Sequence, residues 1–361
     1  MDYKDILLRD NIRDLLPYPI EDHAYRIKLD ANENPCSIDW AGWPDVMEGL
    51  RDIALNRYPD PHARALKDAV SGYVHWPASG MILGNGSDEL IQYILMAYGG
   101  PERPVYAPHP SFSMYRIIAL SMGQKFLAIP LGEGFELCVH DALLKELAAP
   151  PQKLVFIATP NNPTGNAFKR EDVLAIVKAT RGIVCIDEAY LDFCDDEGFL
   201  GVLPQFEHVI ILRTLSKIGL AGLRVGILLA NESVIEAISK VRLPFNLNVV
   251  SQFLAREVLM RQDLLRDMIG TIREHRERLY QEMVKIPGLR VFPSQANFIL
   301  FTCEGGVASI YQGLLEEGIL IRMFPPEGPW PGFLRVTVGT GHECETFIDV
   351  LNRIMAQGGR E

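Results

Sequence analysis

The most constraining feature of this sequence is a series of short apolar segments in its central part, each bounded by turn residues. Residues 153–158, 183–186, 209–212 and 225–229 form four such segments. Apolar runs of this length are typical of strands that are buried on both faces. Between the first two lies an amphipathic stretch, residues 169–180, that fits a crossover helix. This alternation predicts an α/β fold built on a mostly parallel sheet.

Beyond residue 243 the pattern changes from short strands to long helical periodicity. Residues 250–260 and 272–284 are predicted helices, and the second of them ends at an Ile-Pro-Gly sequence. A strand, a helix and two further strands are predicted after it, and together they make a compact α+β unit. Their residues are 296–301, 306–317, 318–324 and 333–339.

A chain of 361 residues is too long for one small core, which favours a large domain and a smaller one. We expect an N-terminal arm that contributes to the small domain, a large sheet domain, and a small C-terminal domain. Their predicted bounds are residues 1–40, 41–270 and 271–361.

The composition limits the class of protein. Hydrophobic residues make up 48% and charged residues 22% of the chain, which is the balance of a folded globular protein. The formal charge of -11 and the lack of clustered Lys and Arg argue against a nucleic-acid binder. The six cysteines are scattered without a CxxC pair, so we expect free thiols and no metal site. Neither a signal-peptide core nor a run of about 18 apolar residues occurs, and a cytoplasmic protein without membrane contact is expected.

Polar residues follow two neighbouring predicted strands. Residues 161–165, with the sequence NNPTG, come directly after the first strand, where open α/β sheets place ligands. Asp187 and Tyr190 lie at the end of the next strand, in the sequence IDEAY. A buried acid costs several kcal/mol unless it is paired, and a protonated pyridine nitrogen is one partner that would keep it ionised. The alternatives are a simple Pro-Gly turn for the first motif and a helix-capping or salt-bridged loop acid for the second.

A third strand leads into Lys217, in the sequence RTLSK, and then into a glycine-rich segment. A lysine at a sheet edge among apolar residues and glycines is partly removed from water. Its amine pKa is therefore lowered, which suits Schiff-base chemistry. Ser216 and Arg224 can converge beside it on one phosphate group. An exposed surface lysine would need no such surroundings.

A glycine loop, residues 83–91 with the sequence LGNGSDELI, opens an apolar helix. Gly84, Gly86 and Ser87 lead into the N-terminus of this helix, where free N–H groups and the helix dipole attract an anion. Phe112, in a later segment, offers a stacking face for a heteroaromatic ring. These signals follow one another along the chain at sheet edges, as a single cofactor site would require.

Taken together, the motifs resemble those of the fold-type I pyridoxal-phosphate aminotransferases and, within them, of the histidinol-phosphate aminotransferases. The motifs are LDANENP (29–35), RYPDP (57–61), LGNGSDELI (83–91), NNPTG (161–165), DEAY (187–190), RTLSK (213–217), GLRVG (222–226) and LRVTVG (334–339). The resemblance covers nearly the whole chain. It implies a large domain with a mostly parallel seven-stranded sheet sandwiched by helices, and a small α+β domain.

By this resemblance, Lys217 forms a Schiff base with pyridoxal 5′-phosphate and Asp187 pairs with the pyridine nitrogen, so these two residues and Tyr190 would be catalytic. Asn162 and Tyr190 are implied to hydrogen-bond the ring oxygen, and Phe112 to stack on the ring, where many relatives have Tyr. The implied phosphate ligands are Gly86, Ser87, Asp88, Ser216, Arg224 and, from the second subunit of a homodimer, Tyr58. Lys217 and Arg224 are seven positions apart, one fewer than in many relatives, from which we expect a tighter turn.

The resemblance also implies substrate ligands. Arg335 would clamp a carboxylate or a phosphate, and the other implied ligands are Tyr18, Asn162 and Arg322. Arg322 can equally be a solvated charge at a strand end.

The implied reaction is the reversible transfer of an amino group from L-glutamate to imidazole-acetol phosphate. It gives 2-oxoglutarate and L-histidinol phosphate in histidine biosynthesis. Two alternatives stay open: an aminotransferase for aromatic amino acids, and a decarboxylase of L-threonine phosphate. The motifs LDANENP and LRVTVG favour an aminotransferase over the decarboxylase. A non-catalytic scaffold on the same fold is disfavoured because every catalytic position is filled.

Overall fold

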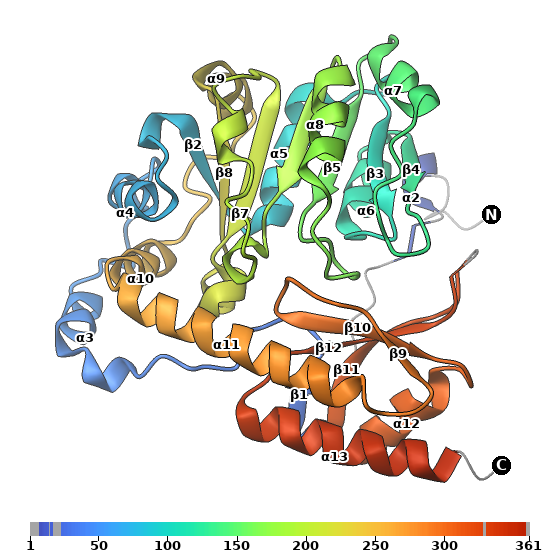
Figure 1. Cartoon of the computed structure of the whole chain (residues 1–361). Coiled ribbons are helices and arrows are strands. Elements are labelled where there is room, and N and C mark those ends of the chain that lie inside the picture. The colour runs from blue at the N-terminus through green and yellow to red at the C-terminus, as the bar shows by residue number, and fades with distance from the viewer. Residues whose placement is uncertain (1–6, 14, 17–22, 328–329, 359–361) are drawn as a thin grey trace.

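The computed structural model describes residues 7–13, 15–16, 23–327 and 330–358, and its strands form two sheets (Figure 1). The larger sheet has seven strands in the order β2-β8-β7-β6-β5-β3-β4. Among them β8 alone runs antiparallel to its neighbours, so the sheet is mostly parallel, as predicted. These strands are β2 (Met81–Asn85), β3 (Val105–His109), β4 (Phe126–Pro130), β5 (Leu154–Ala158), β6 (Ile183–Asp187), β7 (Val209–Thr214) and β8 (Val225–Ala230).

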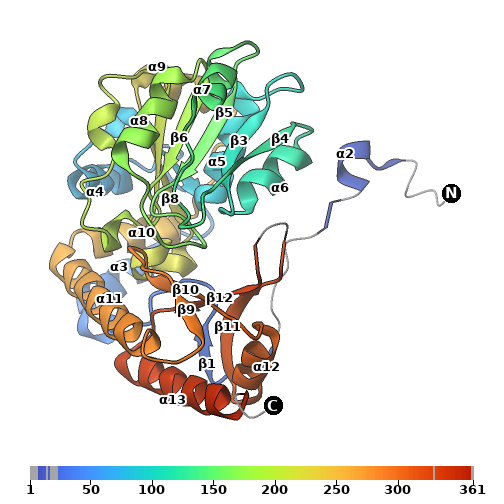
Figure 2. The same ribbon diagram turned by 45° about the vertical axis from the view of Figure 1, so that its right-hand side comes forward.

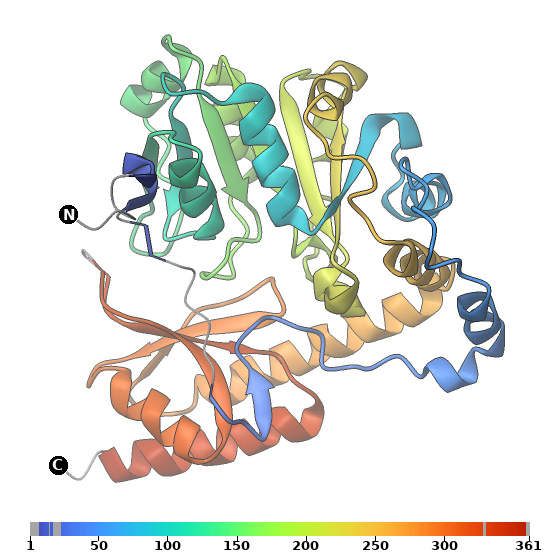
Figure 3. The same ribbon diagram turned by 180° about the vertical axis from the view of Figure 1, so that it is seen from behind.

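Alternate side chains of the central strands face opposite sides of this sheet, and helices cover both sides. In β5, Val155 and Ile157 belong to one buried cluster, whereas Phe156 and Ala158 belong to another. Burial on both faces is the reason why these strands appear in the sequence as unbroken apolar runs. Figure 1 shows α8 in front of the sheet, and Figure 3 shows the cyan α5 covering the opposite face.

The helices around the larger sheet contribute their apolar faces to the two clusters. One cluster receives α4 (Arg64–Val74), α7 (Asp141–Ala148), α8 (Arg170–Ala179) and α10 (Val249–Leu259). The other receives α5 (Ser87–Tyr98), α6 (Met114–Ser121) and α9 (Glu232–Ser239).

The second sheet has five strands in the order β1-β11-β12-β10-β9. Its edge strand β1 comes from the N-terminal part of the chain and runs parallel to β11, with Ile27 opposite Ile319. Helices α11, α12 and α13 belong to the same part of the molecule (Figure 1). The elements are β1 (Ile27–Leu29), β9 (Leu289–Val291), β10 (Phe298–Cys303), β11 (Ile319–Phe324), β12 (Phe333–Thr337), α11 (Gln262–Met283), α12 (Ala308–Glu316) and α13 (Gly341–Gly358).

Helix α11 begins earlier than the sequence pattern predicts. Leu265, Met268 and Ile272 are buried at spacings of three and four residues, so one apolar stripe continues through the first half of the helix. Gly270 lowers the helix propensity of this half. A Cβ built at Gly270 meets nothing within 4 Å, and packing of the apolar stripe outweighs the propensity cost. The same helix therefore runs from α10 to the second sheet (Figures 1 and 2).

Shorter elements complete the fold. Helix α2 is held against α6 because Asn11 Nδ2 donates to the carbonyl oxygen of Leu120 at 2.7 Å. These elements are α2 (Asp10–Arg13), α3 (Pro44–Arg51), η1 (Trp40–Gly42), η2 (Ala78–Gly80), η3 (Leu191–Phe193), η4 (Leu200–Val202), η5 (Ser216–Leu220) and η6 (Ala221–Leu223). Within the described ranges, each helix is too short or too polar to cross a membrane.

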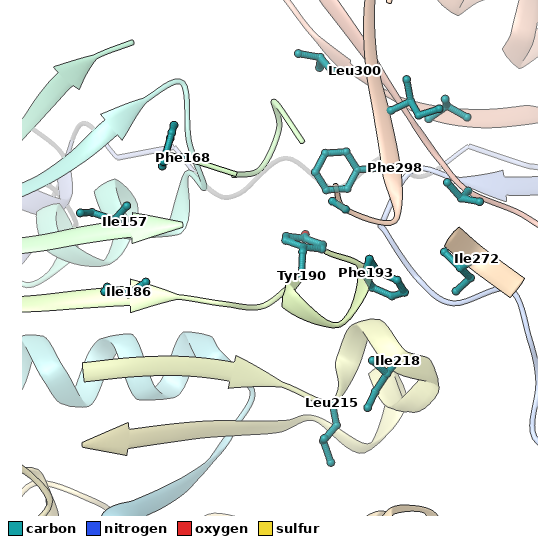
Figure 4. Packing of buried hydrophobic residues seen from close by; sticks show 14 of the residues in the cluster. Ile157, Phe168, Ile186, Tyr190, Phe193, Leu215, Ile218, Ile272, Phe298 and Leu300 are labelled. Carbon is teal, nitrogen blue, oxygen red and sulfur yellow. The ribbon is translucent and has the colours of Figure 1, made fainter. Parts of the chain in front are cut away.

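The two sheets meet where the strands of the larger sheet end. Figure 4 shows the strands of Ile157 and Ile186 leading toward Tyr190, which lies next to Phe298 of β10. The rings of Tyr190 and Phe298 are 5.1 Å apart and nearly perpendicular. One buried cluster runs through this junction into both sheets. Residues that follow β5, β6 and β7 are thus placed where open α/β sheets bind ligands.

Candidate active site

A cavity of about 360 Å³ lies at the junction of the two sheets. Its volume is in the range of small-molecule sites. The residues expected from the sequence that line it are Ser87, Asp88, Phe112, Asn162, Asp187, Tyr190, Ser216, Lys217, Arg224, Arg322 and Arg335. Strand ends, the start of α5 and the second sheet all contribute to the wall.

Lys217 lies in the tight turn η5 directly after β7. Its side chain is half-buried, and its Nζ is 3.5 Å from the carbonyl oxygen of Ala31. Removal from water lowers the pKa of this amine to about 8, and the positive charges of Arg335 and Arg224 act in the same direction. A larger fraction of the amine is therefore neutral near pH 7 than in an exposed lysine, which makes it a competent nucleophile and base.

Asp187 is the last residue of β6 and is buried. Its Oδ2 accepts a hydrogen bond from Tyr115 Oη at 2.6 Å, and its Oδ1 accepts one from the N–H of Ala189 at 3.1 Å. Burial raises the pKa of the carboxyl to about 6 in spite of these two bonds. A cationic partner in the cavity would stabilise the ionised form, and a protonated ring nitrogen is such a partner.

Glycines bring the N-terminus of α5 close to Arg224. Gly86 has a φ of 83°, and a Cβ built there would lie 2.5 Å from Arg224 Nη2. A Cβ on Gly226 would lie 2.5 Å from the carbonyl carbon of Gly86. Only residues without side chains fit at these two positions. The result is a place where the free N–H groups of α5, the Ser87 and Ser216 hydroxyls and a guanidinium converge, as an anion requires.

Arg224 reaches this place although it follows Lys217 by only seven positions. The turns η5 and η6 together take up the interval, and Arg224 itself has the left-handed φ of 54°. Its Nη2 is 3.5 Å from Asp88 Oδ2. The Asp88 carboxylate cannot donate a hydrogen bond to a phosphate, so this residue can serve an anion only through its main-chain N–H.

Two arginines from the second sheet form the opposite wall of the cavity. Arg335 is buried on β12, and its guanidinium donates to Asn162 Oδ1 and to the carbonyl oxygen of Asp30. Arg322 lies directly opposite it on β11. Two guanidinium groups side by side on neighbouring strands favour a bidentately bound carboxylate or phosphate.

Among the described residues, two expected site residues, Tyr58 and Gly86, do not line the cavity of the single chain. Tyr58 is 82% exposed and stacks on Phe245, with ring centroids 4.6 Å apart. Tyr18 lies outside the described residues. Conversely, Asn32 and Tyr115 line the cavity although the sequence pattern assigned them no role. Tyr115 follows Phe112 by three positions, a spacing that puts both on one side of a helix start, and this was the available signal.

The donor set fits pyridoxal 5′-phosphate. The glycine-lined start of α5 with Arg224 suits its phosphate, Asp187 suits its ring nitrogen, and Lys217 suits its aldehyde. The fit rests on space as well as charge, because a side chain at position 86 would displace the Arg224 guanidinium and one at position 226 would displace the backbone that leads into α5.

Comparisons with known proteins agree with this geometry. The family model described as aminotransferase class I and II matches residues 26–351. A protein named histidinol-phosphate aminotransferase 2 from Nitrosococcus oceani is 43% identical, over 95% of this chain and 96% of that protein. The histidinol-phosphate aminotransferase of Aquifex aeolicus is 38% identical, over 96% and 97% of the two chains.

Solved structures share the fold. The histidinol-phosphate aminotransferase of Sinorhizobium meliloti, solved in complex with pyridoxal-5'-phosphate, superposes with a TM-score of 0.84 at 24% identity, over 97% of this chain and 98% of that one. The L-threonine-O-3-phosphate decarboxylase of Porphyromonas gingivalis has a TM-score of 0.77 at 20% identity, over 91% and 99%. The fold alone therefore does not separate the two reactions. Sequence identity does, and the chain belongs to the class I and II aminotransferases and, within them, to the histidinol-phosphate aminotransferase family.

Proposed function

We propose that this chain is a pyridoxal-phosphate-dependent transaminase of histidine biosynthesis. It transfers an amino group reversibly from L-glutamate to imidazole-acetol phosphate and yields 2-oxoglutarate and L-histidinol phosphate. The observation that carries the proposal is that Lys217, Asp187 and Arg224 line one cavity, and that Arg335 and Arg322 line the same cavity from the second sheet. The names of the relatives support the choice of substrates.

When bound, pyridoxal phosphate withdraws electrons from the carbon that carries the transferred amino group. Lys217 would hold the cofactor covalently until the donor's amino group displaces it. Its free neutral amine would then take the proton from the substrate's α-carbon and deliver it to C4′ of the cofactor, which is the shift that moves the amino group. Its lowered pKa of about 8 places this exchange near physiological pH. Asp187 keeps the ring nitrogen protonated, because an ionised carboxylate in a buried place stabilises a nearby cation.

The remaining cofactor contacts come from the cavity wall. Arg224, Ser216 and the Gly86–Asp88 start of α5 hold the phosphate, with Asp88 acting through its main chain. Phe112, which lines the same cavity, would supply a stacking face for the ring.

Asn162 and Tyr190, which both line the cavity, would hydrogen-bond the ring oxygen. Tyr190 is buried, and burial raises the pKa of its phenol, so it stays protonated and can donate a hydrogen bond.

Both substrates are anions, and the paired arginines of the second sheet select for them. Arg335 binds the carboxylate of glutamate or the phosphate of imidazole-acetol phosphate, with Asn162 beside it. Arg322 adds a second guanidinium from β11. We also assign Tyr18 to the substrate side of the site.

We further propose that the active form is a homodimer in which Tyr58 reaches the phosphate of the other subunit. Tyr58 lies among exposed apolar side chains, with Leu55 76% and Leu243 63% exposed. Its ring is already stacked on Phe245. Burial of such a group by a second copy removes apolar surface from water and orders the phenol. Light scattering would measure the molar mass and so the number of subunits. Tyr58→Phe should weaken cofactor binding but leave the dimer intact.

The division at residues 40 and 270 and the cytoplasmic location stay predictions from the sequence. Residue 270 lies inside the continuous helix α11, so limited proteolysis with mass mapping, which cuts exposed linkers before packed elements, tests that bound, and an uncut α11 would move it to an end of the helix. Cell fractionation tests the cytoplasmic location.

A substrate panel tests the proposed function. With L-glutamate as donor, the purified protein loaded with pyridoxal phosphate should aminate imidazole-acetol phosphate with a much higher kcat/KM than phenylpyruvate. Borohydride reduction followed by peptide mass mapping should place the cofactor on Lys217. A preference for phenylpyruvate would move the function to aromatic amino acids, and carbon dioxide release from L-threonine phosphate would indicate a decarboxylase. Full turnover by Lys217→Ala would exclude the mechanism.

A further inference from the structure

Three consecutive residues that follow β1 each contact a different residue of the proposed site. The carbonyl oxygen of Asp30 accepts a hydrogen bond from Arg335, and that of Ala31 lies 3.5 Å from Lys217 Nζ. The third residue, Asn32, makes its contact with its side chain. Its Nδ2 donates to Tyr190 Oη at 2.9 Å. Asn32 is therefore the position of this segment where a substitution can alter one contact chemically without changing the main chain.

Asn32 is held rigidly by the second sheet. It is 1% exposed and has the left-handed φ of 54°. Its N–H donates to Thr337 Oγ1 of β12 at 2.9 Å, and its carbonyl oxygen accepts from Asn297 Nδ2 at 2.9 Å. Tyr190 follows β6 of the larger sheet, so the hydrogen bond between Asn32 and Tyr190 joins the two sheets.

The surroundings determine which way the Asn32 amide faces. Thr337 Oγ1 accepts from the Asn32 N–H and donates its own hydrogen to Asn32 Oδ1 at 3.4 Å. With Oδ1 facing Thr337, the NH₂ group faces Tyr190, and the phenol oxygen must be the acceptor. The phenol hydrogen then has to point away from Asn32. Because Tyr190 lines the cavity, that hydrogen is available to a ligand.

We propose that Asn32 is a positioning residue, which by donating to Tyr190 Oη directs the phenol hydrogen toward the ring oxygen of the bound cofactor. The inference rests on the proposed function. Phe298, packed edge-on against Tyr190 at 5.1 Å, restricts the ring itself, and Asn32 sets the direction of the hydroxyl. A donor fixed in this way stabilises negative charge on the ring oxygen.

The test substitution is Asn32→Asp. Aspartate has the same shape and tolerates a left-handed backbone, but its ionised side chain accepts the Tyr190 hydrogen and does not donate one. The cofactor-loaded protein is titrated across neutral and alkaline pH while its visible absorption is followed. Loss of the donor should raise the pH midpoint of the spectral change by about one unit, a tenfold change in proton affinity. kcat should fall by about tenfold, while KM for L-glutamate changes by less than about twofold.

A matched control separates positioning from packing. Asn297→Asp makes the same isosteric change in an equally buried amide that contacts Asn32 and not Tyr190. Its spectral midpoint should shift less than that of Asn32→Asp, because the change weakens the hold on Asn32 but leaves the amide donor to Tyr190 in place. Thr337→Val lets the Asn32 amide rotate and should shift the midpoint in the same direction as Asn32→Asp, whereas Thr337→Ser should restore it. In a Tyr190→Phe background, Asn32→Asp should add no further shift, because both act on one hydrogen.

Equal midpoint shifts in Asn32→Asp and Asn297→Asp would overturn the inference, as would a full additional shift in the Tyr190→Phe background. If Asn32→Asp does not fold, as thermal melting would show, the Thr337→Val and Thr337→Ser pair decides alone. Native protein that gains no visible band with pyridoxal phosphate, or that transfers no amino group, would refute the proposed function instead. The two failures are therefore distinguishable.

Discussion

The hydrogen bond from Tyr115 to Asp187 allows a quantitative prediction. Tyr115 is fully buried, and its hydroxyl lies 2.6 Å from the carboxylate that is proposed to pair with the ring nitrogen. Tyr115→Phe removes one donor and leaves the ring in place. A hydrogen bond to a charged group contributes about 1.5–3 kcal/mol. Since one pKa unit corresponds to about 1.4 kcal/mol, the pKa of Asp187 should rise by about one to two units from its value of about 6.

The consequence should be visible in the acid limb of the pH profile. Without cofactor, about nine tenths of Asp187 is ionised at pH 7 when its pKa is about 6, and the variant should fall to about half or less. The charge of a protonated ring nitrogen lowers both pKa values in the loaded protein, so kcat at pH 7 should drop by at most about two- to tenfold and recover toward the native value as the pH rises. Steady-state transamination measured over a range of pH gives both quantities.

A second tyrosine provides the control. Tyr106 is also buried and donates to a carboxylate, Glu146 Oε1, at 2.9 Å, but it does not line the cavity. Tyr106→Phe should leave the acid limb in place. The reasoning is refuted if the acid limb of Tyr115→Phe coincides with the native one, or if Tyr106→Phe moves it equally.

Three further predictions concern other parts of the site. Gly86→Ala places a Cβ 2.5 Å from Arg224 Nη2 at a φ of 83°, a strain of about 1–3 kcal/mol, so urea unfolding should show a free energy of unfolding lower by about that amount, and displacement of Arg224 should weaken pyridoxal phosphate binding. Gly222→Ala, where a Cβ meets nothing within 4 Å, should keep the native stability and affinity, and equal values in both variants would contradict the steric argument. Arg335→Lys loses the planar fork, so KM for imidazole-acetol phosphate should rise at least about tenfold, and an unchanged KM would remove Arg335 from the substrate site. Burial raises the pKa of Asp187 from 3.8 to about 6, so the cofactor-free protein should lose about 3 kcal/mol of unfolding free energy as the pH rises from below 4 to above 6. Urea unfolding should show this loss in the native protein and a flatter profile in Asp187→Asn.

Four strands of the central sheet, β5 to β8, could be predicted from the sequence because they are buried on both faces, whereas β2, β3 and β4 were not predicted from the residue pattern. A segment such as Leu154–Ala158 has no polar residue to obscure the pattern, and its burial is complete in the structure. The first half of α11 was not predicted because Gly270 and many charged residues obscure its apolar stripe in the sequence. That stripe stabilises the helix only through its packing in the folded protein. Strands β1 and β9 have three residues each, which is too short for periodicity to be read.

The site was predictable where its chemistry is local in sequence. The glycines before α5 and the lysine after β7 stand beside the elements that position them, so a short motif contains the information. Asn32 and Tyr115 depend on partners that are distant in sequence. Asn32 acts on Tyr190, 158 positions away, and Tyr115 acts on Asp187, 72 positions away. A single sequence contains no signal for such pairs before the fold is known.

The place of β1 in the second sheet has a consequence for synthesis. Residues 27–29 leave the ribosome early, yet their partners are residues 319–321, near the other end of the chain. Pairing over such a separation is intrinsically slow, and an unpaired apolar strand is exposed in the meantime. The contacts of Asp30, Ala31 and Asn32 with the site depend on the same pairing. A nascent chain can therefore complete its large sheet and still lack a working active site until β11 has been made.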